Sequence, residues 1–153
     1  MTRALTAYSL QSHSGPYETW PSSSVLLRDD EPAGVRLPGY ALLAQYETVA
    51  GLLFITDYDC PFEEATAFTL YTADLSRRLG RKQFAVPYGS WSFKALDWLD
   101  ARNVLIHFHC DECWHLQLPE SGWWRPAMRW RRIGAGVLTD DEAAALGLQH
   151  KAR

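Results

Sequence analysis

The chain has 153 residues, of which 47% are hydrophobic and 22% charged, and its formal net charge is −3. This is ordinary globular usage, which excludes a mostly disordered chain, and the length predicts a single domain over residues 1–153. No stretch approaches the ~20 apolar residues of a membrane helix. Residues 1–17 lack the apolar core of a signal peptide, so we expect the three cysteines to be reduced and the protein to be cytoplasmic.

The charge is unevenly divided along the chain. Residues 1–75 contain three basic and ten acidic residues, a net of −7, whereas residues 76–153 contain twelve and eight, a net of +4. This division predicts an acidic face and a basic face. A general nucleic-acid-binding protein would be basic overall, so the composition does not favour that class.

Residues 1–39 are rich in Ser, Pro, Gly and Thr, which are typical of loops. We interpret them as an irregular N-terminal arm with one short strand over Val25–Arg28. The acidic run Asp29–Pro32 is expected to end that strand in a loop.

Residues 40–133 alternate between apolar and polar positions, and turn-forming residues recur about every ten to twelve positions. This spacing predicts an all-β core, mainly an antiparallel meander that is sandwich- or barrel-like, with about seven or eight short strands. Besides Val25–Arg28, the predicted strands are Leu52–Thr56, Thr66–Thr72, Lys82–Val86, Phe93–Leu99, Val104–His109, Trp114–Leu118 and Met128–Ile133.

A short C-terminal helix is predicted over residues 139–147. Thr139 and Glu142 have the spacing of a capping box, in which each side chain accepts a hydrogen bond from the other residue's backbone N–H. Ala143–Leu146 are strong helix formers, and Gly147 is a suitable end.

The segment 104–118 is predicted to form a hairpin, and the sidedness of its residues indicates the register. A two-residue loop would mix apolar and polar side chains on each face. A three-residue loop over Asp111–Cys113 places Phe108 opposite Leu116, and it puts the apolar side chains on one face of the hairpin and the polar side chains on the other. We therefore expect the second register.

In that register three histidines share one face, because His109 lies opposite His115 and His107 lies two residues along the same strand. Three such imidazoles would form a tripod for Zn²⁺ with an open position for water. The arrangement resembles that of carbonic anhydrases in geometry only. Outward-facing polar residues of a half-buried sheet explain the pattern more simply. We therefore predict no metal and no cofactor, and keep a small zinc enzyme as the alternative.

The cysteines allow a second metal interpretation. Cys110-x-x-Cys113 is half of a zinc ribbon, but the other half is missing and only Cys60 remains. A mixed site of these cysteines and a histidine conflicts with the expected register, in which Cys110 points into the core. No P-loop, nucleophile elbow or metalloprotease motif is present, so we expect no enzymatic activity.

The loop after the strand over Leu52–Thr56 concentrates carboxylates around aromatic residues. Two interpretations stay open: a solvated turn, or a partner-binding surface on which charge steers a basic protein and rings anchor it. With Asp29–Glu31, the loop would present a wide negative patch. The predicted partner-binding residues are Asp57, Tyr58, Asp59, Phe62, Glu63 and Glu64.

Residues 122–132 interleave four arginines with three tryptophans. Such interleaving can stack on the bases of single-stranded nucleic acid. The preferred interpretation is structural: a strand with Met128 and Trp130 on one side and Arg129 and Arg131 on the other.

The stretch Gly51–Thr72, followed by short strands and the Trp-containing strand Trp114–Leu118, is similar to immunity proteins of polymorphic toxin, contact-dependent and type VI secretion systems. The resemblance covers residues 40–133 and consists of a pattern of a strand, an acidic loop and a second strand. It implies a cytoplasmic protein that binds a cognate toxin domain and occludes it. Together with the acidic loop, it predicts a non-enzymatic binding protein with a basic partner such as a nuclease, and no membrane or nucleic-acid partner.

Overall fold

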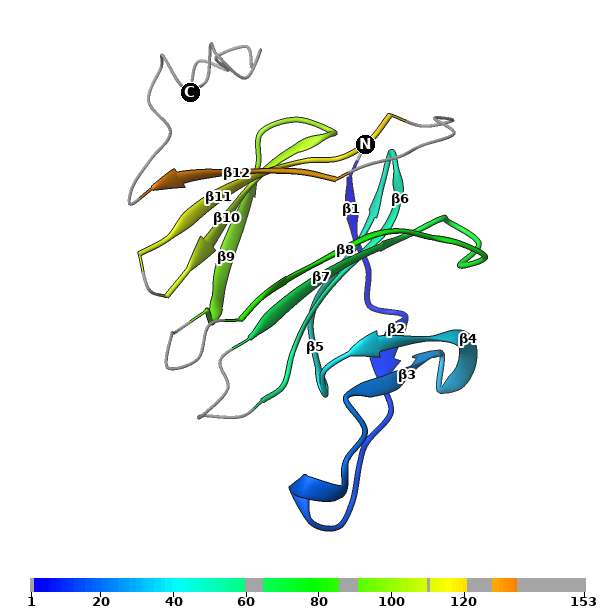
Figure 1. The fold of residues 1–153 in the computed structure, drawn as a ribbon. Helices are drawn as coiled ribbons and strands as arrows, with labels where there is room; N and C mark the ends of the chain where they lie inside the picture. The colour runs from blue at the N-terminus through cyan, green and yellow to red at the C-terminus, as the bar shows by residue number, and fades with distance from the viewer. Residues whose placement is uncertain (1, 60–64, 86–90, 110, 121–127, 135–153) are drawn as a thin grey trace.

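The computed structural model describes residues 2–59, 65–85, 91–109, 111–120 and 128–134. Over these residues the chain forms twelve strands in three antiparallel sheets, one short 3₁₀ turn and no α-helix (Figure 1). The predicted all-β class is confirmed, although the strands are more numerous than expected. Within these ranges no helix is long and apolar enough to cross a membrane.

The elements follow one another along the chain with short connections. They are β1 (Arg3–Ala4), β2 (Tyr8–Leu10), η1 (Tyr17–Thr19), β3 (Ser23–Arg28), β4 (Glu31–Pro38), β5 (Ala41–Thr48), β6 (Gly51–Asp57), β7 (Thr66–Tyr71), β8 (Arg78–Phe84), β9 (Phe93–Trp98), β10 (Asn103–Phe108), β11 (Cys113–Gln117) and β12 (Arg129–Gly134).

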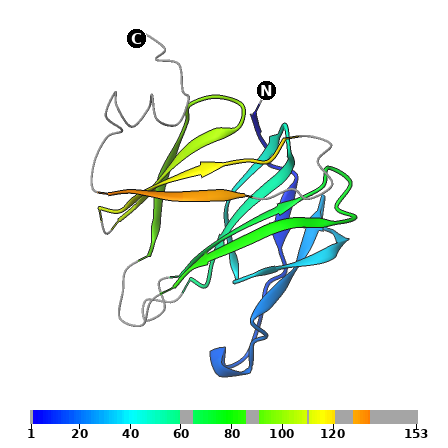
Figure 2. The same ribbon diagram turned by 45° about the horizontal axis from the view of Figure 1, so that its top comes forward.

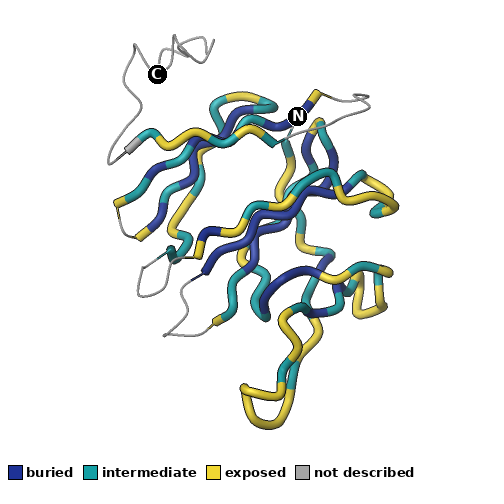
Figure 3. Tube along the Cα trace, in the orientation of Figure 1, coloured by how far each residue is buried: buried dark blue, intermediate teal, exposed yellow. Residues whose placement is uncertain are grey.

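The central sheet has the strand order β1-β5-β6-β7-β8 and is the middle of three layers (Figures 1 and 2). All residues of β7 and all but the last of β6 are buried, which Figure 3 shows as dark blue along these two strands. Burial on both faces explains why residues 52–55 are continuously apolar instead of alternating.

The four-stranded sheet, β12-β11-β10-β9, packs against one face of the central sheet. Their shared core contains side chains from both layers, which makes this pair of sheets a β-sandwich. The buried core residues are Leu53, Ile55, Phe68, Leu70, Phe84, Val104, Ile106, Phe108, Leu116 and Leu118.

The three-stranded sheet, β2-β3-β4, covers the other face of the central sheet. Leu26 and Leu37 are completely buried there against Phe54 and Tyr71. The prediction of an irregular arm over residues 1–39 is therefore wrong, because three strands of that segment form a layer of the fold.

Two local features hid this sheet in the sequence. Pro32 and Pro38 lie in β4, an outer strand of its sheet, where a missing N–H need not cost a ladder hydrogen bond. Asp29 and Asp30 form the tight turn between β3 and β4 with φ of 49° and 66°. Aspartate tolerates this left-handed backbone, so the acidic run turns the chain back into a strand instead of ending the sheet.

Two glycines bring the strands of the central sheet to close approach. Gly51 begins β6 with φ of 137°, and a Cβ there would lie 2.0 Å from the carbonyl oxygen of Tyr71. Gly39 precedes β5 with φ of 90°, and its Cβ would lie 2.3 Å from the carbonyl oxygen of Asp57. Neither position has room for a side chain.

The other strand predictions are confirmed to within a few residues, except that β8 begins at Arg78, ahead of the predicted Lys82. The strands β1, β2, β4 and β5 are not among the predicted strands. The predicted C-terminal helix over 139–147 lies outside the described residues.

Candidate partner-binding surface

The acidic loop begins where β6 ends, at Asp57. The Asp59 N–H donates to Asp57 Oδ1 at 3.0 Å, and Asp59 has φ of 45°, so the chain turns sharply there. Burial raises the pKa of Asp57; the hydrogen bond from Asp59 N–H opposes this effect and the Asp59 charge adds to it. Phe62, Glu63 and Glu64 lie outside the described residues.

Tyr58, between these carboxylates, belongs to a group of five rings that we call the aromatic surface. Its centre is Tyr40, whose ring centroid lies 5.5 Å from Tyr58 and 5.1 Å from Trp20. His13 and Tyr17 lie 5.3 and 5.7 Å from Tyr40. Three segments, distant in sequence, therefore supply one cluster: the β2–β3 loop with its 3₁₀ turn η1, the residue before β5 and the acidic loop.

Hydrogen bonds hold two of these rings, His13 and Trp20. His13 Nε2 lies 2.7 Å from Ser24 Oγ, and the buried Ser24 hydroxyl donates to the Gly39 carbonyl at 2.6 Å. Trp20 Nε1 is 3.2 Å from the carbonyl oxygens of both Ser14 and Gly15. These two rings are thus held in place before any partner arrives, which lowers the entropy lost on binding.

The aromatic surface remains open to solvent. Tyr17 is 38% exposed, and the other four rings are half-buried. The β2–β3 loop that carries three of them projects from the body of the molecule and is largely exposed (Figures 1 and 3). Glu18, beside Tyr17, and Asp59 are exposed carboxylates in the same segments. Rigid rings with acidic neighbours can anchor a basic partner.

Sequence reasoning found only Tyr58 among these rings. The available signal was the density of His13, Tyr17 and Trp20 within a Ser-, Pro- and Gly-rich segment, because aromatic residues in a loop have no strand face to bury them. The predicted contribution of Asp29–Glu31 is absent here. Those residues lie at the far end of the β3–β4 hairpin, whereas its Ser23–Pro38 end lies next to Gly39 and Tyr40.

The predicted register of the histidine hairpin is wrong. β10 and β11 pair Ile106 with Trp114 and His107 with Cys113, and the Phe108 N–H donates to the Glu112 carbonyl at 2.9 Å. Compared with the prediction, the strands are displaced by an even number of residues. Both registers therefore place the same side chains on the same face, and sidedness could not distinguish them.

The displacement separates the three histidines. His115 lies opposite Leu105, and its Nε2 is 2.9 Å from Asn103 Oδ1. His107 Nε2 is 3.0 Å from Asp97 Oδ2, and His109 is exposed beyond the end of β10. The Zn²⁺ tripod is therefore not assembled, and the described part of the chain contains no group of three metal-binding side chains.

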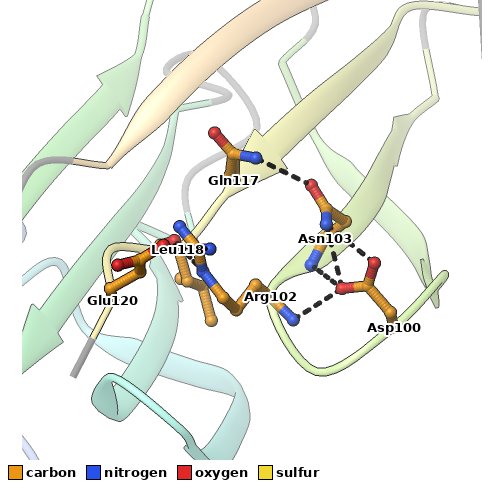
Figure 4. Close-up of polar contacts among 6 residues, drawn as sticks. All are labelled: Asp100, Arg102, Asn103, Gln117, Leu118 and Glu120. Atoms are coloured by element: carbon orange, nitrogen blue, oxygen red, sulfur yellow. Dashed lines mark hydrogen bonds and ion pairs between the residues drawn. The ribbon is translucent and has the colours of Figure 1, made fainter. Parts of the chain in front are cut away.

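A polar network lies where β9 turns into β10, and Figure 4 shows its members. Asp100 accepts hydrogen bonds from the backbone N–H groups of Arg102 and Asn103, both at 2.8 Å, and from the Asn103 amide. Arg102 also donates to the Leu118 carbonyl and to Glu120, both at 3.1 Å. The network ties the turn to the end of β11.

The pKa directions in this network fit a structural role. Burial acts to raise the pKa of Asp100, but the hydrogen bonds from Arg102 and Asn103 outweigh it and hold the pKa below its usual range. Burial, together with the positive charge of Arg131, lowers the pKa of His115. His115 is 3% exposed, so no substrate-sized group reaches it, and we assign the network to stability.

The arginine- and tryptophan-rich segment is a strand in its described part, as the structural interpretation predicts. Trp130 pairs with Leu116 and its ring centroid lies 5.0 Å from that of Phe68, whereas Arg129 and Arg131 occupy the opposite face. Trp123 and Trp124 lie outside the described residues, as do two of the three cysteines. Cys113 is buried.

Comparisons with protein-family models, with curated proteins and with solved structures give no match to this chain.

Proposed function

We propose that this protein is a non-enzymatic binding protein that captures a basic macromolecule through the aromatic surface and the adjoining acidic loop. One observation carries the proposal: five rings meet at the surface, around Tyr40, outside either apolar core. Solvated turns do not require such a cluster, whereas aromatic anchors dominate the energy of many protein interfaces.

The rings and the carboxylates would have different roles in binding. The rings supply apolar area with little loss of freedom, because aromatic side chains have few rotatable bonds and hydrogen bonds already hold His13 and Trp20. Asp57, Asp59 and Glu18 supply negative charge that draws a positive surface towards them. We therefore expect ring substitutions to act on the dissociation rate and charge substitutions on the association rate.

The resemblance to immunity proteins gives the proposal its specific form, a cognate toxin domain as the partner. A toxin that acts on nucleic acid has a positive groove, and a complementary acidic protein would block it without chemistry. A standard interface of ~1,600 Å² is enough for such occlusion.

The test uses the protein encoded by the gene adjacent to this one. The double variant Asp57→Asn and Asp59→Asn removes two charges from the loop but keeps the side-chain oxygens of the turn. Its matched control is Asp29→Asn and Asp30→Asn, which removes the same charge at the far end of the β3–β4 hairpin. We expect the loop variant to bind about five- to tenfold more weakly at low salt, with the control close to wild type.

Two results would contradict the proposal. Equal losses in the two variants would show an effect of net charge without a defined surface. An adjacent gene that encodes no toxin, or a toxin that this protein neither binds nor inhibits, would exclude the immunity role.

A further inference from the structure

A second charged surface lies where the outer strands of two sheets meet. β8 is an outer strand of the central sheet, and β12 is one of the four-stranded sheet. The two strands face each other across the edge of the sandwich: the ring centroids of Phe84 and Trp130 are 5.2 Å apart, and a Cβ on Gly80 would lie 3.0 Å from Met128 Cε. We call their basic residues the basic band: Arg78, Arg81, Lys82, Arg129, Arg131 and Arg132.

The register shows how these side chains are arranged. Arg81 pairs with Thr69, on the face of the central sheet away from the sandwich core, and Arg78 pairs with Tyr71 on the same side. Arg129 and Arg131 pair with Gln117 and His115.

Arg129 and Arg131 face outward from the four-stranded sheet. Lys82 and Arg132 lie between the two pairs, with Lys82 Nζ 5.9 Å from the Trp114 ring centroid. The band therefore wraps around the edge of the sandwich, whose sheets are about 10 Å apart.

Most of this charge is not neutralised within the described residues. Five of the six side chains are exposed, and only Arg132 forms an ion pair there, with Glu112. After burial, the positive charge of Arg78 is the next cause that lowers the pKa of Arg81, so the charges act on each other. The sequence has no acidic residue between Asp74 and Asp97.

Protection against edge-to-edge aggregation does not explain the band fully. Charged residues on outer strands do prevent unwanted pairing. Two of the other four outer strands, however, have charges of both signs: β9 has Lys94 and Asp97, and β4 has Glu31 and Arg36. In the basic band, by contrast, the charged residues of β8 and β12 are all positive.

We propose that the basic band binds the phosphate backbone of nucleic acid. Arginine offers a planar fork of donors that matches phosphate, and five of the six residues are arginines. A protein partner would need apolar anchors, but the large exposed hydrophobic residues of the described chain, Tyr17, Leu43 and Val49, all lie elsewhere. Phosphate contacts need no such anchors.

The contact differs from stacking on bases. Trp114 and Trp130 pack against the sandwich core, so the described band offers charge and no exposed ring. Binding is therefore independent of sequence and sensitive to salt.

The experiment compares two variants of equal charge. The band variant carries Arg78→Gln, Arg81→Gln, Arg129→Gln and Arg131→Gln. The control carries Arg3→Gln, Arg28→Gln, Arg36→Gln and Lys94→Gln, four exposed residues outside the band. Each change lowers the formal net charge from −3 to −7, because four positive charges are removed. Circular dichroism establishes that both variants are folded.

Fluorescence anisotropy measures binding to labelled oligonucleotides, single-stranded and duplex, at about 50 and about 200 mM salt. We expect wild type to bind at low salt and to weaken as salt rises. The band variant should bind at least about tenfold more weakly, with a salt slope for single strands reduced by about 3, and the control should bind more tightly than the band variant.

Three results would overturn the proposal. One is the absence of binding to either oligonucleotide at low salt, and another is an equal loss in the two variants. The third is capture of polyglutamate but not of nucleic acid, which would assign the band to an acidic protein. This assay measures oligonucleotide binding and contains no toxin, so failure here leaves the proposed function standing.

Discussion

The molecule contains two ring clusters with nearly the same internal spacing, one centred on a buried ring and the other on a half-buried ring. Between the two sheets of the sandwich, the ring centroids of Trp114 and Trp130 lie 5.0 and 5.2 Å from that of Phe84, which is 5% exposed. In the aromatic surface, the ring centroids of Trp20 and Tyr58 lie 5.1 and 5.5 Å from that of Tyr40, and all three rings are partly exposed. Ring geometry therefore does not reveal the role of a cluster. Phe84, at the centre of the sandwich cluster, loses its water when the chain folds, whereas the surface rings keep part of theirs until a partner displaces it.

The largest expected effect follows from removing a sandwich ring. Phe84→Ala leaves a cavity beneath Trp114 and Trp130, and we expect it to lower the free energy of unfolding by about 3–5 kcal/mol. Urea denaturation followed by tryptophan fluorescence measures this loss. A loss below about 1 kcal/mol would show that these rings do not support the sandwich.

The corresponding change in the aromatic surface should affect binding instead of stability. Trp20→Ala is expected to weaken partner binding by about 2 kcal/mol, roughly thirtyfold, while changing the free energy of unfolding by less than about 1 kcal/mol. Titration calorimetry and urea denaturation give the two numbers. Trp20→Phe, which keeps an aromatic ring, should recover part of the affinity. A stability loss as large as that of Phe84→Ala would erase the distinction between the clusters.

A polar site on the four-stranded sheet gives an intermediate case. Asn103 is 7% exposed and contacts both Asp100 and His115. Asn103→Ala leaves the buried His115 without its partner, so we expect a loss of about 1–2 kcal/mol in stability, with partner binding unchanged. Gln117→Ala is the control, because its contact with Asn103 is the long one at 3.5 Å. Equal losses in the two variants would contradict the assignment.

The smallest expected effect is a loss of stability of the sandwich at acidic pH. Because the pKa of His115 is lowered from 6.5 in the folded state, the unfolded chain takes up the proton first. Stability is therefore fully present above pH 6.5 and falls as the pH drops from there towards the folded pKa. The urea midpoint measures this decline, which His115→Gln should reduce. The control His109→Gln, at an exposed position, should keep the wild-type slope.

Most of the sandwich could be predicted from the sequence, because alternation and turn residues report local burial. The alternation around Phe68 and the continuous run at Leu53 both indicated strands. The three-stranded sheet could not be predicted this way, since Pro32 and the Asp29-Asp30 turn resemble loop signals until the edge position of β4 is known. Register was equally hidden, because a displacement by an even number of residues leaves every side chain on its predicted face.

The candidate surface was found only in part, and for a physical reason. Asp57, Tyr58 and Asp59 are contiguous, so their chemistry is visible in a short window of sequence. His13, Trp20 and Tyr40 meet them only through the packing of the three-stranded sheet beside the central sheet. The basic band shows the same limit: half-chain charge predicted a basic face, but not that β8 and β12 would face each other at one edge of the sandwich.

The close approach at Gly39 and Gly51 has a consequence for how the middle strand finds its alignment. β6 places apolar side chains on both of its faces. If its register shifted by one residue, the positions of Leu53 and Ile55 in the core would be taken by neighbours that are also apolar. The burial of apolar side chains therefore does not distinguish the two registers. The backbones of neighbouring segments can approach this closely only at a residue without a side chain. Gly51 and Gly39 allow this close approach at the two ends of β6. Its interior can therefore exchange one apolar residue for another of similar size, while the two glycine positions tolerate no replacement.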